Sequence, residues 1–352
     1  MSHTPATERR NVSFLTEVRD AVTPRATLLV LGVIALQLLF IASYVGALHD
    51  PEPKDVPFGV AAPGTAAKET AARLEKLPGT PLDPRTVTDE ADARQRIMDR
   101  EIDGALIVDP RGSRDTLLVA SGGGTALATT LETLVTGLEK EQRRTVETVD
   151  VAPASGRDFD GLSSFYLVVG WCVGGYLCAS ILAISTGARP ANPRRAAIRL
   201  IVMALVSIVG GLGGAVIIGP VLGALPGSVL DLWGLGALTT FAVGAATLAL
   251  QGVFGIVGIG LAILLVVVAG NPSAGGAFPL PMLPPFWKAI GPALPPGAGT
   301  WAARSIAYFK GNALTASLLV LWAWAVAGVL LTLAAAALRR RRHEPELPTQ
   351  AG

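Results

Sequence analysis

Charge is scarce in this 352-residue sequence: 16% of the residues are charged, whereas soluble domains carry about 25%. Disorder is excluded, because a disordered chain combines low hydrophobicity with high net charge, and here 51% of the residues are hydrophobic and the net charge is +2. Cysteine is also scarce. The only two, Cys172 and Cys178, lie six residues apart in one apolar run and so on different faces of a helix, which excludes a disulfide scaffold.

Long apolar runs account for the missing charge. A helix needs about 20 apolar residues to cross the hydrocarbon core. The run Leu232–Gly270 is too long for one span, so we expect two short spans joined by a tight turn near Gln251 and Gly252. The sequence therefore predicts an α-helical polytopic membrane protein with six transmembrane helices. They lie in Ala26–Leu48, Phe165–Gly187, Ile198–Gly223, Leu232–Gly270 (two spans) and Leu314–Leu338.

Arginine near the ends of the spans predicts the orientation, because cytoplasmic loops carry an excess of Lys and Arg. With six spans, three basic groups fall on one side, so we expect both termini in the cytoplasm of a bacterial cell. Lys288, Arg304 and Lys310 disagree, since they would lie outside, but reversing the chain would put four consecutive arginines there. The three groups are Arg9, Arg10, Arg19 and Arg25; Arg189, Arg194, Arg195 and Arg199; and Arg339 to Arg342.

A cleaved signal peptide is the rival interpretation of the first span. Val45-Gly46-Ala47 resembles a small-residue cleavage site. The apolar stretch, however, exceeds the usual signal core of about 7–15 residues, and cleavage would leave an odd number of spans. We therefore expect an uncleaved anchor.

The segment between the first two spans predicts an extracytoplasmic α/β domain. Residues 50–163 carry 14 Lys and Arg against 21 Asp and Glu, a net charge of −7. Short β-branched runs predict strands from Val56, Gly104, Asp115 and Thr145. Helical spacing predicts helices over Thr65–Leu77, Glu90–Ile102 and Thr125–Arg144. The expected organisation is 1–25, cytoplasmic amphipathic segment; 26–48, first span; 49–163, outer α/β domain; 164–338, five-helix transmembrane domain with an outer interfacial loop at 271–312; and 339–352, basic cytoplasmic tail.

No catalytic or cofactor chemistry stands out. The Gly-rich turn Ser121–Thr125 lacks the Lys-Ser/Thr pair of a phosphate-binding P-loop, so we expect a structural turn. The three histidines, His3, His49 and His343, flank the domains, and the acidic residues lack metal-ligand spacing. We expect no enzyme, cofactor or metal site, and no nucleic-acid partner.

Two segments carry a resemblance to known families. Val87–Pro110 combines a short acidic helix, a small turn and an apolar strand that ends in Pro. Asn271–Gly311 is similar to the "Asn-Pro-x-x-Gly-Gly-x-Phe-Pro … Leu-Pro-x-x-Phe" segment that precedes the last span in YhgE/Pip-like membrane proteins. In layout, the whole chain resembles the permease subunits of type-2 ABC exporters that carry an extracytoplasmic insert. That resemblance implies a separate nucleotide-binding ATPase subunit and a homodimer or a sister permease.

Two cytoplasmic segments are candidates for coupling to that ATPase. Arg10–Val22 resembles the amphipathic helix that leads into the first span in that class. The loop with Arg189, Arg194, Arg195 and Arg199 stands where such permeases place a coupling helix. The alternative is that both segments only anchor the chain at the membrane interface.

Two further patterns suggest packing and a pathway. Gly170 with Gly174, and Gly210 with Gly214, suit close helix packing, within one chain or at a dimer seam. The loop 271–312 holds several aromatic residues with basic residues among them, a combination that is typical of a membrane interface or of the outer exit of a lipid-facing pathway. Its candidate residues are Phe286, Trp287, Lys288, Trp301 and Arg304.

The sequence favours a permease-like subunit that exports a hydrophobic or amphiphilic compound and is energised by a separate chain. No Walker motif is present, and no acid or histidine lies inside a span, which argues against ATP hydrolysis by this chain and against proton coupling. The alternative is a non-transporting scaffold or receptor whose outer domain binds a cell-surface or secretion partner.

Overall fold

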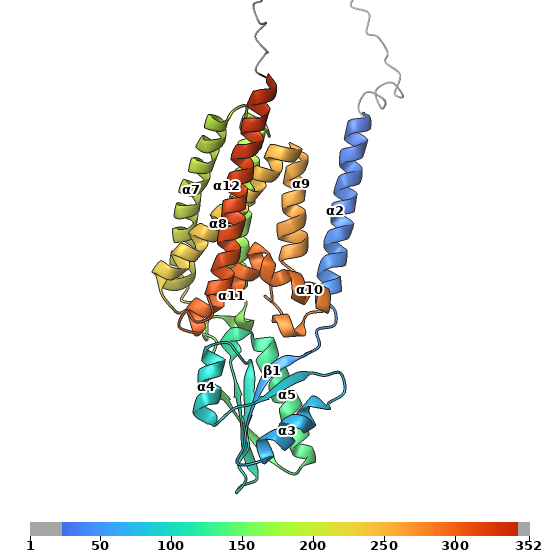
Figure 1. Cartoon of the computed structure of the whole chain (residues 1–352), viewed down its shortest axis with the longest axis vertical. Coiled ribbons are helices and arrows are strands. Elements are labelled where there is room, and N and C mark those ends of the chain that lie inside the picture. The colour runs from blue at the N-terminus through green and yellow to red at the C-terminus, as the bar shows by residue number, and fades with distance from the viewer. Residues whose placement is uncertain (1–22, 344–352) are drawn as a thin grey trace, which may run out of the picture.

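The computed structural model describes residues 23–343, and within them the protein is mostly helical (Figure 1). Five helices are long and apolar enough to cross a membrane, which is the architecture of a polytopic membrane protein. A smaller domain with a β-sheet lies at one end of these helices (Figure 1). The five are α2 (Pro24–Leu48), α6 (Ser163–Thr186), α7 (Pro193–Val216), α8 (Val229–Phe254) and α12 (Thr315–His343).

Local polar residues set where α7 and α8 begin. Asn192 Oδ1 accepts a hydrogen bond from Arg195 N at 2.9 Å, and Pro193 is the first residue of α7. Ser228 Oγ accepts a hydrogen bond from Asp231 N at 3.2 Å at the start of α8. Both arrangements satisfy backbone N–H groups that would otherwise lack partners in the first helical turn.

The sheet domain, Val56–Asp150, contains one five-stranded sheet in the order β2-β1-β3-β4-β5. β3 and β4 are antiparallel, and the other neighbouring strands are parallel. Helices α3 (Ala66–Glu75), α4 (Glu90–Met98) and α5 (Thr125–Glu141) connect or flank the strands. The strands are β1 (Val56–Ala61), β2 (Leu82–Thr86), β3 (Gly104–Ile107), β4 (Arg114–Val119) and β5 (Thr145–Asp150).

Alternation along the strands gives the sheet domain two apolar layers. The side chain of Leu106 points to one side of the sheet, where it packs in one cluster with Leu74 of α3 and Leu131 of α5. Ala105, one residue earlier, points to the other side and packs with Ile97 of α4. This period of two is the pattern of a sheet that is covered on both faces.

The structure has one strand that the sequence analysis missed. The other four begin at, or within one residue of, the expected positions. β2 reads Leu-Asp-Pro-Arg-Thr, which lacks the β-branched run of a typical strand. It lies at the edge of the sheet, beside β1 alone, and an edge strand is where a proline such as Pro84 is tolerated.

The long apolar run is divided later than expected. α8 continues through Gln251 and Gly252 to Phe254, and the chain turns at Gly255, whose φ is +67°. The expected turn position was therefore wrong by about one helical turn. Gly255 can turn the chain because it has no Cβ and so tolerates a positive φ.

The segment that follows this turn is short. α9 (Val257–Ile263) and the wider helical turns of η4 (Leu264–Gly270) form a single apolar helix that is shorter than the five long ones. The count of six spans therefore stays a prediction. The two ends of the described chain lie on the same side of the helices, away from the sheet domain (Figure 1).

The loop 271–312 forms a layer of short helices between the long helices and the sheet domain (Figure 1). η5 (Leu280–Met282), α10 (Pro285–Ile290) and η6 (Gly291–Ala293) lead into α11 (Pro295–Tyr308). Nearly all of α11 is buried. This layer is the platform on which the sheet domain rests.

Candidate functional site

The sheet domain and α11 meet in a polar contact that we call the junction. Arg100 follows α4 in a tight turn and has a φ of +59°. Its Nη1 donates hydrogen bonds to Trp301 O at 2.9 Å and to Ser305 Oγ at 2.8 Å. The guanidinium carbon lies 3.3 Å from the centroid of the Trp301 ring and 4.7 Å from that of Phe309. Two aromatic faces thus hold the plane of the Arg100 guanidinium.

Arg304 ties three chain segments together at the junction. Its Nη1 donates to Gly275 O at 2.6 Å, and its Nη2 donates to Gly276 O at 2.8 Å and to Gly161 O at 3.2 Å. The side chain is 4% exposed, and its Nε has no hydrogen-bond partner among the described residues. A buried donor without a partner is unfavourable, so Arg304 Nε is an exception among the buried polar groups of the junction.

Further hydrogen bonds fix the sheet domain and its linker on the platform. Tyr308 Oη donates to Asp158 Oδ2 at 2.5 Å, and Asp158 Oδ1 accepts from Ser163 N at 2.8 Å. Asn312 Nδ2 donates to Met98 O at 3.0 Å and to Asp99 Oδ1 at 2.9 Å. The domain is therefore held by specific bonds, and we expect it to move with the platform.

The Gly-rich turn Ser121–Thr125 belongs to this contact. A Cβ at Gly122 would lie 2.5 Å from Tyr308 Cγ, and one at Gly124 would lie 2.2 Å from Pro279 Cγ. The glycines allow the sheet domain to approach the platform closely. The turn packs against protein, in keeping with the structural role expected from its sequence.

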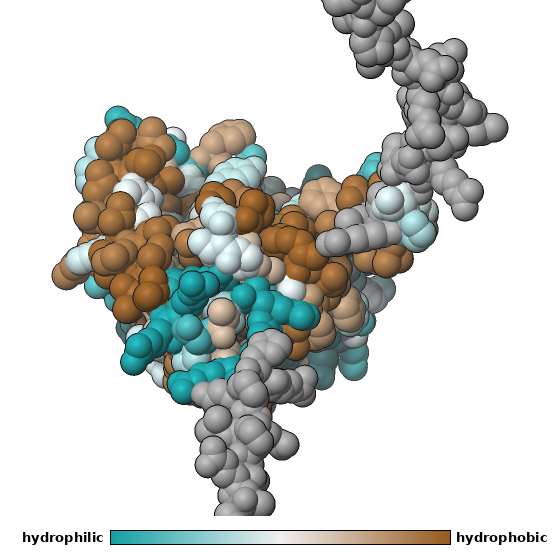
Figure 2. Space-filling view, turned by 90° about the horizontal axis from the view of Figure 1, so that it is seen from above, coloured by the Kyte–Doolittle hydropathy of each residue, from teal (hydrophilic) through white to brown (hydrophobic). Residues whose placement is uncertain are grey.

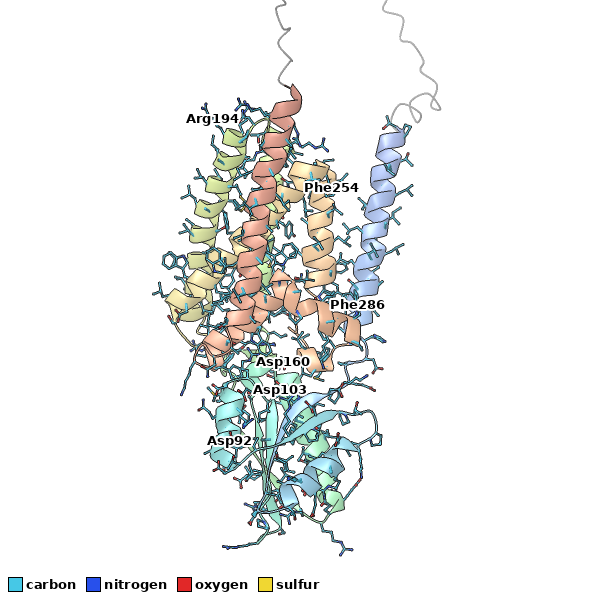
Figure 3. All side chains as sticks on the ribbon, in the orientation of Figure 1. Asp92, Asp103, Asp160, Arg194, Phe254 and Phe286 are labelled. Atoms are coloured by element: carbon cyan, nitrogen blue, oxygen red, sulfur yellow. The ribbon has the colours of Figure 1, made fainter. Side chains whose placement is uncertain are left out.

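A cavity with a volume of about 220 Å³ lies at the junction. We call it the junction cavity. Asp103 stands at the end of the sheet domain that faces the platform (Figure 3). Its carboxylate accepts no hydrogen bond within residues 23–343, and burial raises its pKa to about 6, although the nearby charges of Arg100 and Lys288 act to lower it. The charged residues that line the cavity are Asp55, Arg100, Asp103, Lys288 and Arg304.

Arg100 and Lys288 are the other two cations of the junction cavity. Burial, with repulsion from Arg304, lowers the pKa of Arg100 to about 9, so its guanidinium remains protonated at pH 7. Lys288 Nζ donates one hydrogen bond, to Lys54 O at 3.2 Å. Both therefore bring a positive charge and free donors to the cavity.

The structure brings three of the five expected pathway residues together. Lys288, Trp301 and Arg304 line the junction cavity. Phe286 is 63% exposed on α10 beside the lower end of α2 (Figure 3), and its ring meets that of Trp287 edge to face at 5.1 Å. Arg100 and Asp103 were not among the expected residues, because both come from the sheet domain about 200 residues earlier in the chain.

The opposite end of the helices, which we call the basic end, holds the expected coupling arginines. Figure 2 shows this end from above, with hydrophilic residues gathered in the middle and hydrophobic surface on either side. A groove of about 620 Å³ is lined by Arg189, Arg195 and Arg199 together with apolar residues of α6 and α7. Arg194 is exposed at the start of α7 (Figure 3).

Several of these arginines bond to the carboxyl ends of helices. Arg199 donates to Thr186 O, Gly187 O and Ala188 O at the end of α6. Arg189 Nη2 donates to Val253 O at 3.1 Å, and Arg339 Nη2 donates to Gly252 O at 2.6 Å, both at the end of α8. Cations suit helix carboxyl ends because the last carbonyls carry partial negative charge. Arg194 and Arg195 remain exposed, and the segment Arg10–Val22 lies outside the described residues.

The four expected packing glycines are not equivalent. A Cβ at Gly214 would lie 2.4 Å from Trp171 Nε1, so Gly214 packs within the chain. A Cβ at Gly170, Gly174 or Gly210 would meet no atom of the described residues within 4 Å. These three face outward, and a second copy against them stays a prediction.

In comparisons with known proteins, no family model, no curated protein and no solved structure matches the chain. The resemblance to ABC exporter permeases and to YhgE/Pip-like proteins therefore stays an expectation.

Proposed function

We propose that this chain is a permease-like subunit that exports a hydrophobic or amphiphilic compound and is energised by a separate ATPase chain. The observation that carries the proposal is the junction cavity, which combines charged side chains with apolar ones at the end of apolar helices. A compound with an apolar part and a polar part needs both environments on its way out of a membrane. A scaffold that only presents the sheet domain has no need of such a chamber.

The described helices offer no means of driving transport alone. Neither Asp, Glu nor His occurs in the apolar middle of α2, α6, α7, α8 or α12, so a proton has no carrier within these helices. The sequence also lacks a Walker motif. The energy would therefore come from another chain at the basic end, which would be cytoplasmic.

The contacts at the basic end indicate which arginines could bind the ATPase. Arg189, Arg199 and Arg339 already bond to helix ends, so their removal would damage the fold. Arg194 and Arg195 are exposed, so replacing them would change the surface charge without removing a bond to a helix end. We therefore assign the contact with the ATPase to these two residues.

Co-purification from the native membrane tests this proposal. The variant Arg194→Glu with Arg195→Glu is compared with Lys68→Glu and Lys76→Glu, which make the same change of charge at exposed positions in α3 and directly after it. We expect a stoichiometric Walker-bearing chain with the wild type and the α3 variant, and its loss in the Arg194 and Arg195 variant. Recovery of surface or secretion proteins without an ATPase would favour the scaffold instead.

A further inference from the structure

The junction cavity has charges that export of an apolar compound does not require. We propose that it is a binding site for a phosphate group, carried by an anionic lipid headgroup or free in solution. This inference concerns the ligand of the cavity and holds whether or not the chain transports anything.

The charges favour an anion. Three cations, Arg100, Lys288 and Arg304, line the cavity against two carboxylates, Asp55 and Asp103. The Asp103 carboxyl ionises less readily than an exposed one, because burial raises its pKa to about 6. In such a partly enclosed place, cations attract a ligand more strongly than they would in water.

Several donors in the cavity are unused. Arg100 uses Nη1 for Trp301 and Ser305, and its Nε and Nη2 have no hydrogen-bond partner among the described residues. Lys288 Nζ has likewise made only one of its three possible hydrogen bonds. Phosphate oxygens accept several hydrogen bonds at once and suit guanidinium and ammonium donors in this way.

The site is organised before any ligand arrives. Trp301 and Phe309 hold the Arg100 guanidinium between their rings, and three carbonyls hold Arg304. A fixed guanidinium loses little freedom on binding, which favours affinity.

The size and the position suit a headgroup. A volume of about 220 Å³ is many times the roughly 10–15 Å³ that one water needs, which is room for a phosphate and a small polyol. Pro57, Pro279, Leu280 and Pro281 give the cavity an apolar wall. The exposed Phe286 of the platform lies next to the lower end of α2 (Figure 3), a helix with many exposed apolar side chains.

Calorimetry on the full chain in a neutral sugar detergent tests the proposal. The probes are dihexanoylphosphatidylglycerol, inorganic phosphate, and dihexanoylglycerol, which lacks the phosphate. Lys288→Ala removes a cavity cation and should weaken binding of the phosphate-bearing probe roughly tenfold. Lys54→Ala is the matched control, because Lys54 is exposed and close by but its side chain does not line the cavity. It should change the dissociation constant less than about twofold.

Asp103→Asn supplies a change of the opposite sign. It removes a negative charge that faces Arg100, Lys288, Arg304 and Asp55 across the cavity, so binding at pH 7.5 should strengthen several-fold. Lowering the pH from 7.5 to 5.5 should strengthen binding of phosphatidylglycerol to the wild type, because Asp103 becomes neutral, and should affect Asp103→Asn much less. If Lys288 and Asp103 served only the fold, Lys288→Ala and Asp103→Asn would not change the binding of the phosphate-bearing probe in opposite directions.

The probes separate the two sources. Binding of phosphatidylglycerol alone supports a lipid headgroup, and comparable binding of inorganic phosphate supports a free phosphate. If neither binds more tightly than dihexanoylglycerol, or if Lys288→Ala and Lys54→Ala behave alike, the proposal is overturned. Because this assay contains no ATPase, its failure would leave the proposed export function to its own test.

Discussion

Helices α2 and α8 are similar in length and composition but differ in what covers them. They have 25 and 26 residues, and both qualify as membrane spans. In its most apolar window, 61% of α8 is buried inside the protein, against 11% of α2. α8 packs against α6, α7 and α12, whereas α2 stands to one side and packs mainly on η4 (Figure 1).

The size of the side chains explains the difference. Glycines of α8 let its neighbours approach: a Cβ at Gly236 would lie 2.4 Å from the Trp171 ring, and one at Gly244 would lie 2.2 Å from Met203 Sδ. The glycines of α2, Gly32 and Gly46, have no neighbour within 4 Å of a Cβ. Hydrophobicity thus indicates which segment can enter a membrane, whereas glycines mark a helix contact only where a neighbouring helix packs on them, as on α8.

The largest expected effect comes from two adjacent glycines of α6. A Cβ at Gly175 would lie 2.6 Å from Thr240 O of α8, whereas one at Gly174 would meet nothing. We expect Gly175→Val to cost about 3 kcal/mol or to prevent folding, because the clash is with backbone. Gly174→Val carries the same intrinsic helix cost without the clash. Size-exclusion profiles in mild detergent distinguish them, and equal profiles would mean that α8 is not covered as described.

A second pair compares the two helices directly. Leu235 of α8 is 2% exposed, and Leu31 of α2 is 57% exposed. Leu235→Ala should lower the free energy of unfolding by about 2 kcal/mol through lost packing, and Leu31→Ala by less than about 0.5 kcal/mol. Denaturant titration in mixed micelles measures both. A larger loss at Leu31 would show that α2 is covered more fully than this chain alone provides.

A third prediction concerns the effect of burial on the pKa of a charged group, Asp103 at the junction, and so on stability. Its pKa is raised to about 6 in the folded protein, from about 3.9 in an unfolded chain. The native state then binds more protons between these values, so this group makes stability fall as the pH rises from about 4 to 6. Asp103→Asn should therefore raise the thermal midpoint by a few degrees at pH 7.5 and change it little at pH 4.5.

The matched control is Glu52→Gln, which makes the same change of charge at an exposed position. It should leave the thermal midpoint unchanged at both pH values. If Asp103→Asn lowers the midpoint at pH 7.5, the Asp103 carboxylate stabilises the junction, and burial is not the dominant influence on it.

The smallest effect on stability is expected at Gly174, where a large side chain should fit. Gly174→Trp should leave the unfolding of one copy unchanged, because the site is open within the described chain. If a second copy packs on this face, the variant should lose the dimer, which mass photometry would detect. A wild-type dimer that survives Gly174→Trp would place the seam elsewhere.

Part of this architecture could be predicted from the sequence. Four strands and the long helices follow from local pattern, but β2 does not, because Pro84 and two charged residues hide it and only its partner β1 makes it a strand. Lys288 and Arg304 could be recognised from the sequence as candidate pathway residues. Arg100 and Asp103 could not, since only tertiary contact brings them to the same cavity. For the glycines, spacing alone was insufficient: Gly174 and Gly175 differ by one residue, which is a rotation of about 100° on a helix.

The central claim is that one copy of this chain is part of a larger, ATPase-driven assembly. Native mass spectrometry of particles extracted with their own lipids tests it most directly. The account predicts two permease-like chains, this chain twice or with a sister subunit, together with Walker-bearing chains. A single copy with no ATPase, in particles that retain their lipids, would contradict it.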